Sequence, residues 1–448
     1  MGRILLTSVG TAGDIIPFVL LGKALQQRGH HVILLTHCAY RGECERAGLS
    51  FVSLDTPAEF EGFIQDGHWL NTGPGITQFL RRYVIPSIAA RVEIIRANCT
   101  ADSVIVARST PSIAARLAAE AMRLPFVSML MAPQHITALT TVAALSETVF
   151  SNEINAIRTA MGISQVCDWH AWWQAASLNL GLWPAWFSPL PERMPVETVL
   201  AGFLWHSEVQ GLELLHPIVG AVPPVLITGG TGMFGGKEFL DACAKACGLL
   251  GWPALLLTRV AALCPENLPE NVRWVEYIPA LDVFMRRVKV VVHHGGMGTL
   301  HGALAAGVPQ VILAAGGDRP DNAFHAARLG VAEFLPRPRW DVPLVAQAIE
   351  RVSDSAAVAQ RCREVAGWFR HTDALTVACD AVEAVVASGR PYCGAGLADG
   401  RECSPVQVED ASASSAAAKL TDLTPEARAL LTARLRQRKQ SSQPPERS

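Results

Sequence analysis

Short runs of consecutive apolar residues recur along the first third of the chain, and helical patterns separate them. The runs occupy residues 3–8, 31–36, 51–54, 103–106 and 125–130. Runs of this length that are mainly apolar predict strands buried on both faces, and strands alternating with helices build parallel sheets. The first unit, a strand, a helix that includes Pro17, and a second strand, predicts a βαβ opening.

A second series with the same pattern begins after a stretch rich in glycine and proline. Its apolar runs lie at residues 225–228, 254–258, 272–275, 290–293 and 311–313, and its helical patterns at 238–250, 300–306, 322–329, 342–352, 355–369 and 372–388. The sequence therefore predicts an α/β protein of two Rossmann-like domains. We expect the carboxyl ends of both sets of strands to face an interdomain cleft. The predicted boundaries are 1–205, a linker over 206–224, and 225–388.

The last part of the chain has a different composition. Residues 389–419 are dominated by Ser, Ala, Gly and Pro, which predicts a flexible tether. Thr424 and Pro425 then mark the start of a short amphipathic helix with a basic face. We interpret residues 389–448 as a flexible tail whose helix either contacts a biosynthetic partner or an anionic membrane surface, or frays in solvent.

The run at 290–293 ends in the most informative stretch of the chain, His293-His294-Gly295-Gly296-Met297-Gly298-Thr299. A glycine turn between a strand and a helix exposes backbone N–H groups to which the helix dipole attracts anions, and glycines allow a phosphate to approach closely. The spacing fits neither the P-loop nor the dinucleotide fingerprint. A two-histidine metal site is disfavoured because adjacent residues on a strand point to opposite faces. The pattern favours phosphate binding.

Composition limits the remaining function classes. The formal net charge of −2 over 448 residues argues against a nucleic-acid-binding face. No apolar run is long enough to span a bilayer, and eleven cysteines without a CxxC motif fit reduced thiols in the cytoplasm. Six of the eleven tryptophans lie between residues 169 and 205. Such a cluster forms core, lines an apolar acceptor pocket or faces a membrane; the pocket candidates are Trp169, Trp173 and Trp186.

Several motifs, in the same order and spacing, resemble those of one enzyme family. They are residues 10–17 (GTAGDIIP), 292–299, 307–310 (GVPQ) and 318–323 (DRPDNA). The chain resembles GT-B-fold nucleotide-sugar glycosyltransferases, the family of bacterial antibiotic and sterol glycosyltransferases. Residues 153–156 and 183–187 are most similar to the rhamnosyltransferase of rhamnolipid synthesis.

The resemblance implies the location of the donor site in the second domain. Tyr277 matches the aromatic residue that stacks on the base, and the backbone of Ile278 matches the group that binds the base edge. Thr231 and Gly232 match the first diphosphate contact, and Asp318 and Arg319 match the pair that reaches the sugar hydroxyls. Arg319 replaces the family's usual glutamine, and Ala12 replaces an arginine common in the wider family. The residues matching the diphosphate-binding turn are His294, Gly296, Met297, Gly298 and Thr299.

The reaction that the resemblance implies needs a base, because the attacking hydroxyl of the acceptor must lose its proton. Asp14 occupies the position of the family's base, although the same residue is also suited to capping the following helix. We expect inversion at the anomeric carbon, because the hydroxyl attacks from the face opposite the diphosphate. We expect no metal, because no acidic cluster suited to Mg²⁺ lies near the glycine turns. The donor is a co-substrate, so no cofactor is expected.

The predicted protein is thus a cytoplasmic enzyme, with membrane association through its tail as an option. It transfers a hexose, deoxyhexose or pentose from a UDP- or dTDP-sugar to a hydrophobic acceptor such as a lipid, a lipopeptide or another secondary metabolite. Two alternatives remain open. One is a catalytically silent partner protein of the same fold, which the retention of Asp14, His294 and Asp318 argues against. The other is a GT-B nucleotide-sugar epimerase, which the aromatic-rich stretch fits less well than an acceptor pocket.

Overall fold

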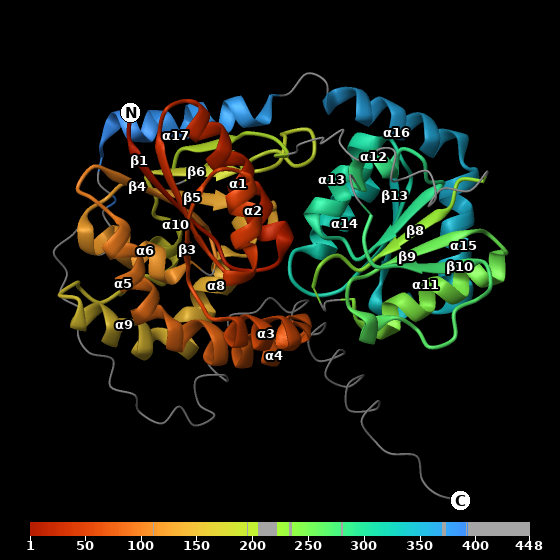
Figure 1. Cartoon of the computed structure of the whole chain (residues 1–448), viewed down its shortest axis with the longest axis horizontal. Helices are drawn as coiled ribbons and strands as arrows, with labels where there is room; N and C mark the ends of the chain where they lie inside the picture. Colours follow the sequence, from red (N-terminus) through yellow and green to blue (C-terminus); the bar gives the residue numbers. More distant parts are fainter. Residues whose placement is uncertain are drawn as a thin grey trace, which may run out of the picture. The chain divides into compact units, whose positions relative to one another are not determined.

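The structure is a computed structural model of the whole chain, and it describes most of residues 1–392. The positions it leaves undescribed are 111, 195, 205–221, 233–234, 279–280, 370–372, 391 and 393–448. The predicted linker at 206–224 therefore lies almost entirely outside the described residues, and so does the basic helix predicted near residue 424. Two parallel sheets organise the described part (Figure 1).

The first sheet has the order β3-β2-β1-β4-β5-β6-β7, and every strand pair in it is parallel. The predicted runs form its first five strands, whereas β6 and β7, which lie in the tryptophan-rich stretch, were not predicted. The order reverses between β1 and β4, and ligands of open α/β sheets bind at such a reversal, outside the carboxyl ends of the strands. The strands are β1 (Arg3–Thr7), β2 (His31–Thr36), β3 (Ser50–Ser53), β4 (Ser103–Arg108), β5 (Phe126–Leu130), β6 (Leu178–Gly181) and β7 (Thr198–Leu200).

Helices cover both faces of this sheet (Figure 1). Their apolar sides complete two cores, one containing Phe18 and Leu21 of α1 and the other containing Val92 of α5 and Leu117 of α6. The helices are α1 (Ala12–Gln27), η1 (Cys38–Tyr40), α2 (Arg41–Arg46), α3 (Pro57–Gln65), η2 (Asp66–Asn71), α4 (Gly73–Phe79), η3 (Leu80–Val84), η4 (Ile85–Ser87), α5 (Ile88–Asn98), α6 (Ile113–Met122), α7 (Gln134–Thr137), α8 (Leu139–Leu145), η5 (Ser146–Phe150), α9 (Ser151–Ala160) and α10 (Trp169–Gln174).

The second sheet has the order β10-β9-β8-β11-β12-β13 and is also parallel throughout. Its order reverses between β8 and β11, so the glycine turn after β11 lies at the second sheet's own ligand-binding position. The strands are β8 (Val225–Thr228), β9 (Ala254–Leu257), β10 (Val272–Val275), β11 (Val290–His293), β12 (Gln310–Ala314) and β13 (Ala332–Pro336). The helices are α11 (Gly236–Leu250), η7 (Ala261–Leu263), α12 (Leu281–Met285), α13 (Met297–Ala306), α14 (Arg319–Arg328), η8 (Arg337–Arg339), α15 (Val342–Asp354) and α16 (Ala356–Trp368).

The helix α17 (Ala374–Ser388) belongs by its packing to the first half of the chain. Ala378, Cys379 and Val382 lie in the same core as α1, and Figure 1 shows the blue α17 over the red and orange elements. Arg28, at the end of α1, forms ion pairs with two carboxylates of α17. The domain boundary predicted at residue 388 therefore assigns this helix to the wrong half, because an apolar helix face does not reveal in sequence which sheet it will cover.

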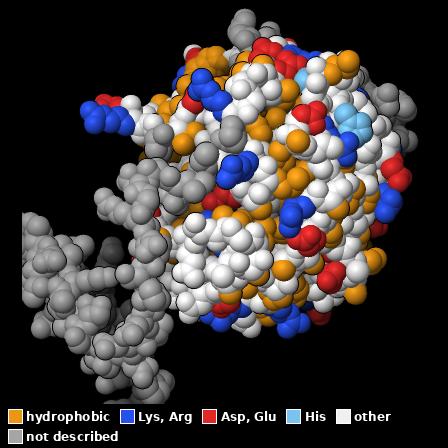
Figure 2. Space-filling view, turned by 90° about the vertical axis from the view of Figure 1, so that its left-hand side faces the viewer, with side chains coloured by type: hydrophobic (Ala, Val, Ile, Leu, Met, Phe, Trp, Pro, Cys, Tyr) orange, Lys and Arg blue, Asp and Glu red, His pale blue; other side chains and the backbone are white. Residues whose placement is uncertain are grey.

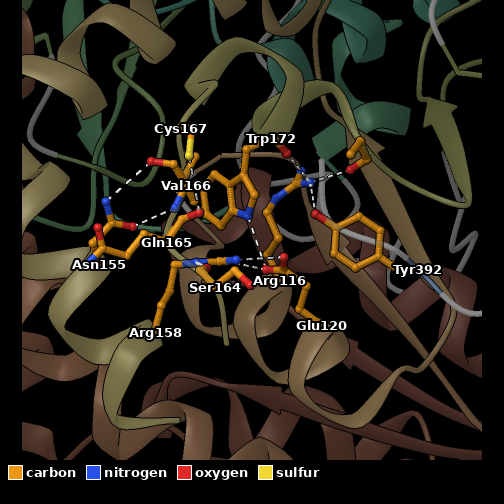
Figure 3. A network of polar contacts seen from close by, with 11 residues as sticks. Arg116, Glu120, Asn155, Arg158, Ser164, Gln165, Val166, Cys167, Trp172 and Tyr392 are labelled. Carbon is orange, nitrogen blue, oxygen red and sulfur yellow. Dashed lines mark hydrogen bonds and ion pairs between the residues drawn. The ribbon is translucent and has the colours of Figure 1, made fainter. Parts of the chain in front are cut away.

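The chain remains ordered beyond α17, where the sequence predicted a flexible tether. Tyr392 is buried, packs against Phe126, and accepts a hydrogen bond from Arg116 at 3.0 Å (Figure 3). Beside this contact lies a buried ion pair between Arg158 and Glu120, and Trp172 donates its indole N–H to the same carboxylate. The tether prediction is therefore wrong for Tyr392; residues 391 and 393–448 lie outside the described part.

Most of the described cysteines are free thiols, as expected from the sequence. Eight described cysteines are free, and Cys243 and Cys247 are buried on one face of α11. Cys167 is disulfide-bonded, so the expectation that all cysteines are reduced is wrong for that residue.

No helix within the described ranges is long and apolar enough to cross a membrane. On the face drawn in Figure 2, basic and acidic side chains are interspersed.

Candidate active site

The turn after β11 presents the start of α13 to solvent at the carboxyl edge of the second sheet. Gly295 has a φ of +91°, a conformation that favours glycine, and Gly296 is the N-cap of the helix. No side chain caps this helix start. The first-turn N–H groups of Met297, Gly298 and Thr299 have no partner within the helix and remain available for an anion, as the sequence predicts.

His294 lies directly beneath this turn and needs glycine on both sides. A Cβ at Gly230 would lie 2.6 Å from its ring, and a Cβ at Gly296 would lie 2.5 Å from it. Burial, followed by the positive charge of Arg319, holds the pKa of His294 well below its ordinary value, so the imidazole is neutral near neutral pH. Its Nδ1 has no hydrogen-bond partner among the described residues. His294 is therefore a neutral hydrogen-bonding group at the anion site rather than a cation.

The neighbouring His293 holds the glycine turn against β12 through two hydrogen bonds. Its Nδ1 accepts a hydrogen bond from the N–H of Gly295, and its Nε2 lies 2.9 Å from the side-chain oxygen of Gln310. Burial lowers the pKa of His293 to about 4. The two histidines thus have different surroundings, as the alternation along a strand predicts. Within the described ranges, no group of three or more His, Cys, Asp or Glu side chains is arranged to hold a metal ion.

Asp318 is held at the start of α14 by a residue that the sequence analysis did not single out. The fully buried Asn322 donates to Asp318 at 2.9 Å and to the backbone oxygen of Gly295 at 3.1 Å. It thereby joins the predicted sugar-binding carboxylate to the phosphate-binding turn. Asn322 belongs to the DRPDNA motif, and its spacing of one helical turn from Asp318 was the signal that could have identified it.

Arg319 points away from solvent and toward the first half of the chain. Its Nε donates to Gly316, and its Nη2 donates to Asn71 of η2 at 3.0 Å. Burial lowers the pKa of this guanidinium to about 10. The predicted contact of Arg319 with the donor sugar stays a prediction; in the structure one of its nitrogens joins the two halves through Asn71.

The aromatic residue predicted to stack on the base is exposed at the end of β10. The guanidinium of Arg259 lies 4.7 Å from the centre of the Tyr277 ring, leaving a cation and an aromatic face side by side. Ile278 is buried behind Tyr277. Thr231 is exposed and Gly232 buried in the loop after β8, next to the undescribed residues 233–234.

Asp14 lies in the first turn of α1, at the reversal point of the first sheet. Its Oδ2 accepts a hydrogen bond from the N–H of Thr11 at 2.8 Å, and its Oδ1 lies 3.0 Å from the guanidinium of Arg108 at the end of β4. The same guanidinium donates to the carbonyl of Val9. Asp14 therefore caps its helix, as one interpretation predicted, and is also oriented by a cation while a fifth of its side chain stays exposed.

A buried histidine supports the loop that precedes Asp14. His37 accepts the N–H of Gly10 on its Nε2 at 2.9 Å, and its Nδ1 contacts Asp55. Burial alone would raise the pKa of Asp55, but hydrogen bonds from His37 and from the N–H of Cys38 lower it. A Cβ at Gly10 would collide with the Asp14 carboxylate, so the loop needs glycine there.

Charges from both halves act on His135, which follows β5. Its Nδ1 lies 2.9 Å from Ser109 Oγ and accepts the N–H of Met131, so its proton resides on Nε2. Burial and then the charge of Arg108 lower the pKa of His135 to about 4, while Asp318 acts in the opposite direction. Burial raises the pKa of Tyr40, the charge of Asp14 raises this pKa further, and the charge of Arg259 lowers it. Groups of both halves thus act on the same two side chains, His135 and Tyr40.

The tryptophans predicted for an acceptor pocket lie in packed interiors. Trp169 and Trp173 are buried in the core beside α5 and α6, and Trp173 donates its indole N–H to Ser146. Trp186 packs against Phe203, Trp368 and Phe369. None of the three lines the cavity beside Arg91 or the one beside Trp340. The placement of Trp169 and Trp173 matches the core interpretation, whereas Trp186 is partly buried at the edge of a core.

Two family models match the chain, one in each half. Residues 4–139 match the glycosyltransferase family 28 N-terminal domain, and residues 259–370 match the erythromycin biosynthesis protein CIII-like C-terminal domain. The chain is 27% identical to the O-mycaminosyltylonolide 6-deoxyallosyltransferase of Streptomyces fradiae, over 81% of this chain and 92% of that protein. It is 25% identical to glycosyltransferase GtfC of Amycolatopsis orientalis, over 84% and 96%.

Solved structures agree with this assignment at the level of the fold. The glycosyltransferase of kitacinnamycin superposes with a TM-score of 0.65 at 20% identity, over 86% of this chain and 99% of that one. Glycosyltransferase VinC in complex with DTDP superposes with a TM-score of 0.61 at 20% identity, over 86% and 100%. The two parallel-sheet halves and these structures show the GT-B fold. The family models and the relatives named above add the class, which is a glycosyltransferase. The chain belongs to the antibiotic-type members of that family.

Proposed function

We propose that the protein transfers a hexose, deoxyhexose or pentose from a UDP- or dTDP-sugar to a hydroxyl group of a hydrophobic acceptor, with inversion and without a metal ion. The observation that carries this proposal is the placement of Asp14. Its partly exposed carboxylate lies at the reversal point of the first sheet, oriented by Arg108, while the anion-binding turn lies at the reversal point of the second.

In the proposed reaction, the acceptor oxygen attacks the anomeric carbon from the face opposite the diphosphate. Asp14 takes the hydroxyl proton as the new C–O bond forms, and the bond from the anomeric carbon to the diphosphate oxygen breaks. General base catalysis of this kind contributes roughly 10²–10⁴ in rate. Inversion follows because a single displacement occurs.

The leaving diphosphate gains negative charge, and the start of α13 offers it unpaired N–H groups and a positive dipole end. Neutral His294 adds a hydrogen bond without the cost of burying a second cation beside Arg319. These groups stabilise the diphosphate from the protein's own atoms, which supports the proposal of metal independence. The complex of VinC with DTDP makes dTDP-sugars the first donors to test.

The acceptor is proposed to be a lipid, a lipopeptide or another secondary metabolite, with rhamnosyl transfer as one option for the sugar. The two alternatives from the sequence predict different behaviour. A catalytically silent partner protein would bind no donor or leave it intact, and an epimerase would act on the nucleotide sugar with no acceptor present. The supported Asp14 carboxylate favours transfer over both.

The testing experiment is the thermal stability of the full chain in the presence of UDP, dTDP and a panel of their sugars. A ligand at about 100 times its dissociation constant stabilises the fold by about 2.7 kcal/mol, a readily measured change in melting temperature. Stabilisation by one nucleotide series identifies the donor. The protein is then incubated with this donor and hydroxylated lipids, and the glycosylated product is detected by mass spectrometry. Absence of any shift with every nucleotide would contradict the donor site and favour the silent alternative.

A further inference from the structure

Arg91 of α5 is a cation inside the first half of the chain for which the described structure provides no ion pair. Its Nε is fully buried and has no hydrogen-bond partner in the described part of the chain. Burial lowers the pKa of the guanidinium. The Arg91 side chain as a whole is partly buried, so the unsatisfied atom is its Nε. A buried polar atom without a hydrogen-bond partner is uncommon in folded proteins and costly.

The nearest carboxylates are already engaged elsewhere. Asp55 and Glu59 lie close enough to favour the charge of Arg91. However, Asp55 contacts His37 and accepts the N–H of Cys38, and Glu59 accepts both the N–H and the hydroxyl of Thr56 in a capping box. Neither carboxylate forms an ion pair with Arg91, so the guanidinium keeps donors for another anion.

Arg91 lines a cavity of about 20 Å³ at the carboxyl end of the first sheet. Apolar side chains form most of its wall, among them Val9, Leu54 and Ile88, and Thr7 and Ser112 add hydroxyl groups. Ser112 is the N-cap of the ten-residue helix α6, and Ala114 and Ala115 of its first turn also line the cavity. The unpaired N–H groups of that turn and Arg91 therefore both favour negative charge in the same space.

The cavity adjoins the loop that carries Asp14. Val9 lines the cavity, and its carbonyl accepts a hydrogen bond from Arg108, the residue that also contacts Asp14. A group bound here is thus connected to the proposed base through two residues. A planar carboxylate matches the fork of the Arg91 guanidinium, which can donate two parallel hydrogen bonds to its two oxygens.

We propose that Arg91 and this cavity bind a carboxylate of the acceptor, so that the acceptor combines an apolar body with an anionic group. The proposal rests on the function proposed above and narrows its acceptor class. Arg91 is a binding residue in this assignment and takes no part in the chemistry. The acceptor's hydroxyl and its carboxylate are then held by neighbouring parts of the same half.

The test compares octanoate with octanamide, which share an apolar chain and differ in charge, by isothermal titration calorimetry on the full chain. We expect octanoate to bind at least tenfold more tightly, because charge-assisted hydrogen bonds to a guanidinium are about twice as strong as neutral ones. Arg91→Gln should remove this preference. Arg96→Gln, on the solvent side of the same helix, is the matched control and should preserve it.

Equal affinity for the two probes, or a preference that survives Arg91→Gln, would overturn the assignment. Inorganic phosphate is titrated as a third probe; Arg91-dependent binding of phosphate in place of octanoate would also overturn it. The thermal response to dTDP is recorded for each variant and shows that the fold is retained. If the unaltered chain responds to dTDP but does not prefer octanoate, the carboxylate site alone is contradicted. If the unaltered chain does not respond to dTDP, the proposed function is contradicted.

Discussion

The guanidinium of Arg108 lies 3.0 Å from the carboxylate of Asp14, so the last residue of β4 orients a residue in the first turn of α1. The two strands β1 and β4 are neighbours in the sheet although about a hundred residues separate them in the chain. Because the sheet order reverses between them, the pair stands at the point where an acceptor would enter.

The Arg108–Asp14 pair predicts a specific kinetic effect. Arg108→Met should lower kcat by roughly tenfold to a hundredfold, since a misplaced catalytic group loses the benefit of orientation. Arg108→Lys retains the charge and should recover part of the loss. The affinity for dTDP should not change, because the donor site lies on the other half. An unaltered kcat in Arg108→Met would limit the pair to a structural role.

Asp14→Asn separates the catalytic role of this residue from its capping role. The amide still offers an oxygen to the N–H of Thr11, so the helix cap is preserved. Transfer should fall at least about a hundredfold because the amide cannot accept the proton. Single-turnover rates and dTDP affinity are measured on the same preparation. Lower thermal stability with normal turnover would mean that Asp14 only caps α1.

The glycines that enclose His294 predict a defect in donor binding. Gly230→Ala and Gly296→Ala should each weaken dTDP binding by about tenfold or more, since either Cβ would displace the imidazole. Gly230 also has a φ of +77°, which adds strain to its replacement. Gly367→Ala is the control, because its Cβ would meet nothing within 4 Å. Equal dTDP affinity in all three variants would show that His294 does not contact the diphosphate.

Much of this arrangement could be predicted from the sequence, and the exceptions have physical reasons. Strands β1 and β11 each contain three consecutive apolar residues, and the glycine turn that follows β11 is a local pattern, so both were identifiable. Arg108 and His135 were missed because each depends on which strands are neighbours, and no local pattern encodes that. The direction of Arg319 depends on Asn71, about 250 residues away, and was equally invisible.

The burial of a single residue could not be predicted from the sequence either, and this limited the interpretation of individual tryptophans and arginines. A tryptophan is suited to both a ligand pocket and a core, so Trp169 and Trp173 could not be assigned before their neighbours were known. Conversely, Arg91 lies in a helix whose surface pattern suggests an ordinary solvated cation. Its burial beside a cavity emerges only when α5 packs against the sheet.

His301 predicts acid sensitivity of the fold. Its ring stacks on Phe203 with centroids 5.5 Å apart, and burial lowers its pKa to about 4 from an ordinary value of 6.5. Between these two pH values, His301 is protonated in the unfolded chain but neutral in the folded protein. The free energy of unfolding therefore falls as the pH drops from about 6.5 toward 4.

His301→Phe should keep the stacking and abolish this contribution. Between pH 7.5 and pH 5, the free energy of unfolding of the native chain should fall by about 1–2 kcal/mol more than that of the variant. Urea denaturation at both pH values measures the gain, and each protein's own value at pH 7.5 serves as its reference. An identical loss of stability in both proteins would show that another group controls the acid response.

The contact between Tyr392 and Arg116 predicts that the segment after α17 stabilises the first half of the chain. Tyr392 is buried against Phe126, and its hydroxyl accepts from Arg116. A chain that stops at residue 388 should be less stable than one that stops at 392 by about 3–5 kcal/mol, the usual cost of removing a buried aromatic side chain.

Tyr392→Phe isolates the hydrogen bond from the packing and should cost only about 1–2 kcal/mol, because Arg116 keeps its bonds to the backbone of Trp172 and Trp173. Thermal melts of the three proteins give the comparison. If the two truncated chains melt at the same temperature, the segment after α17 contributes nothing to the fold of the first half.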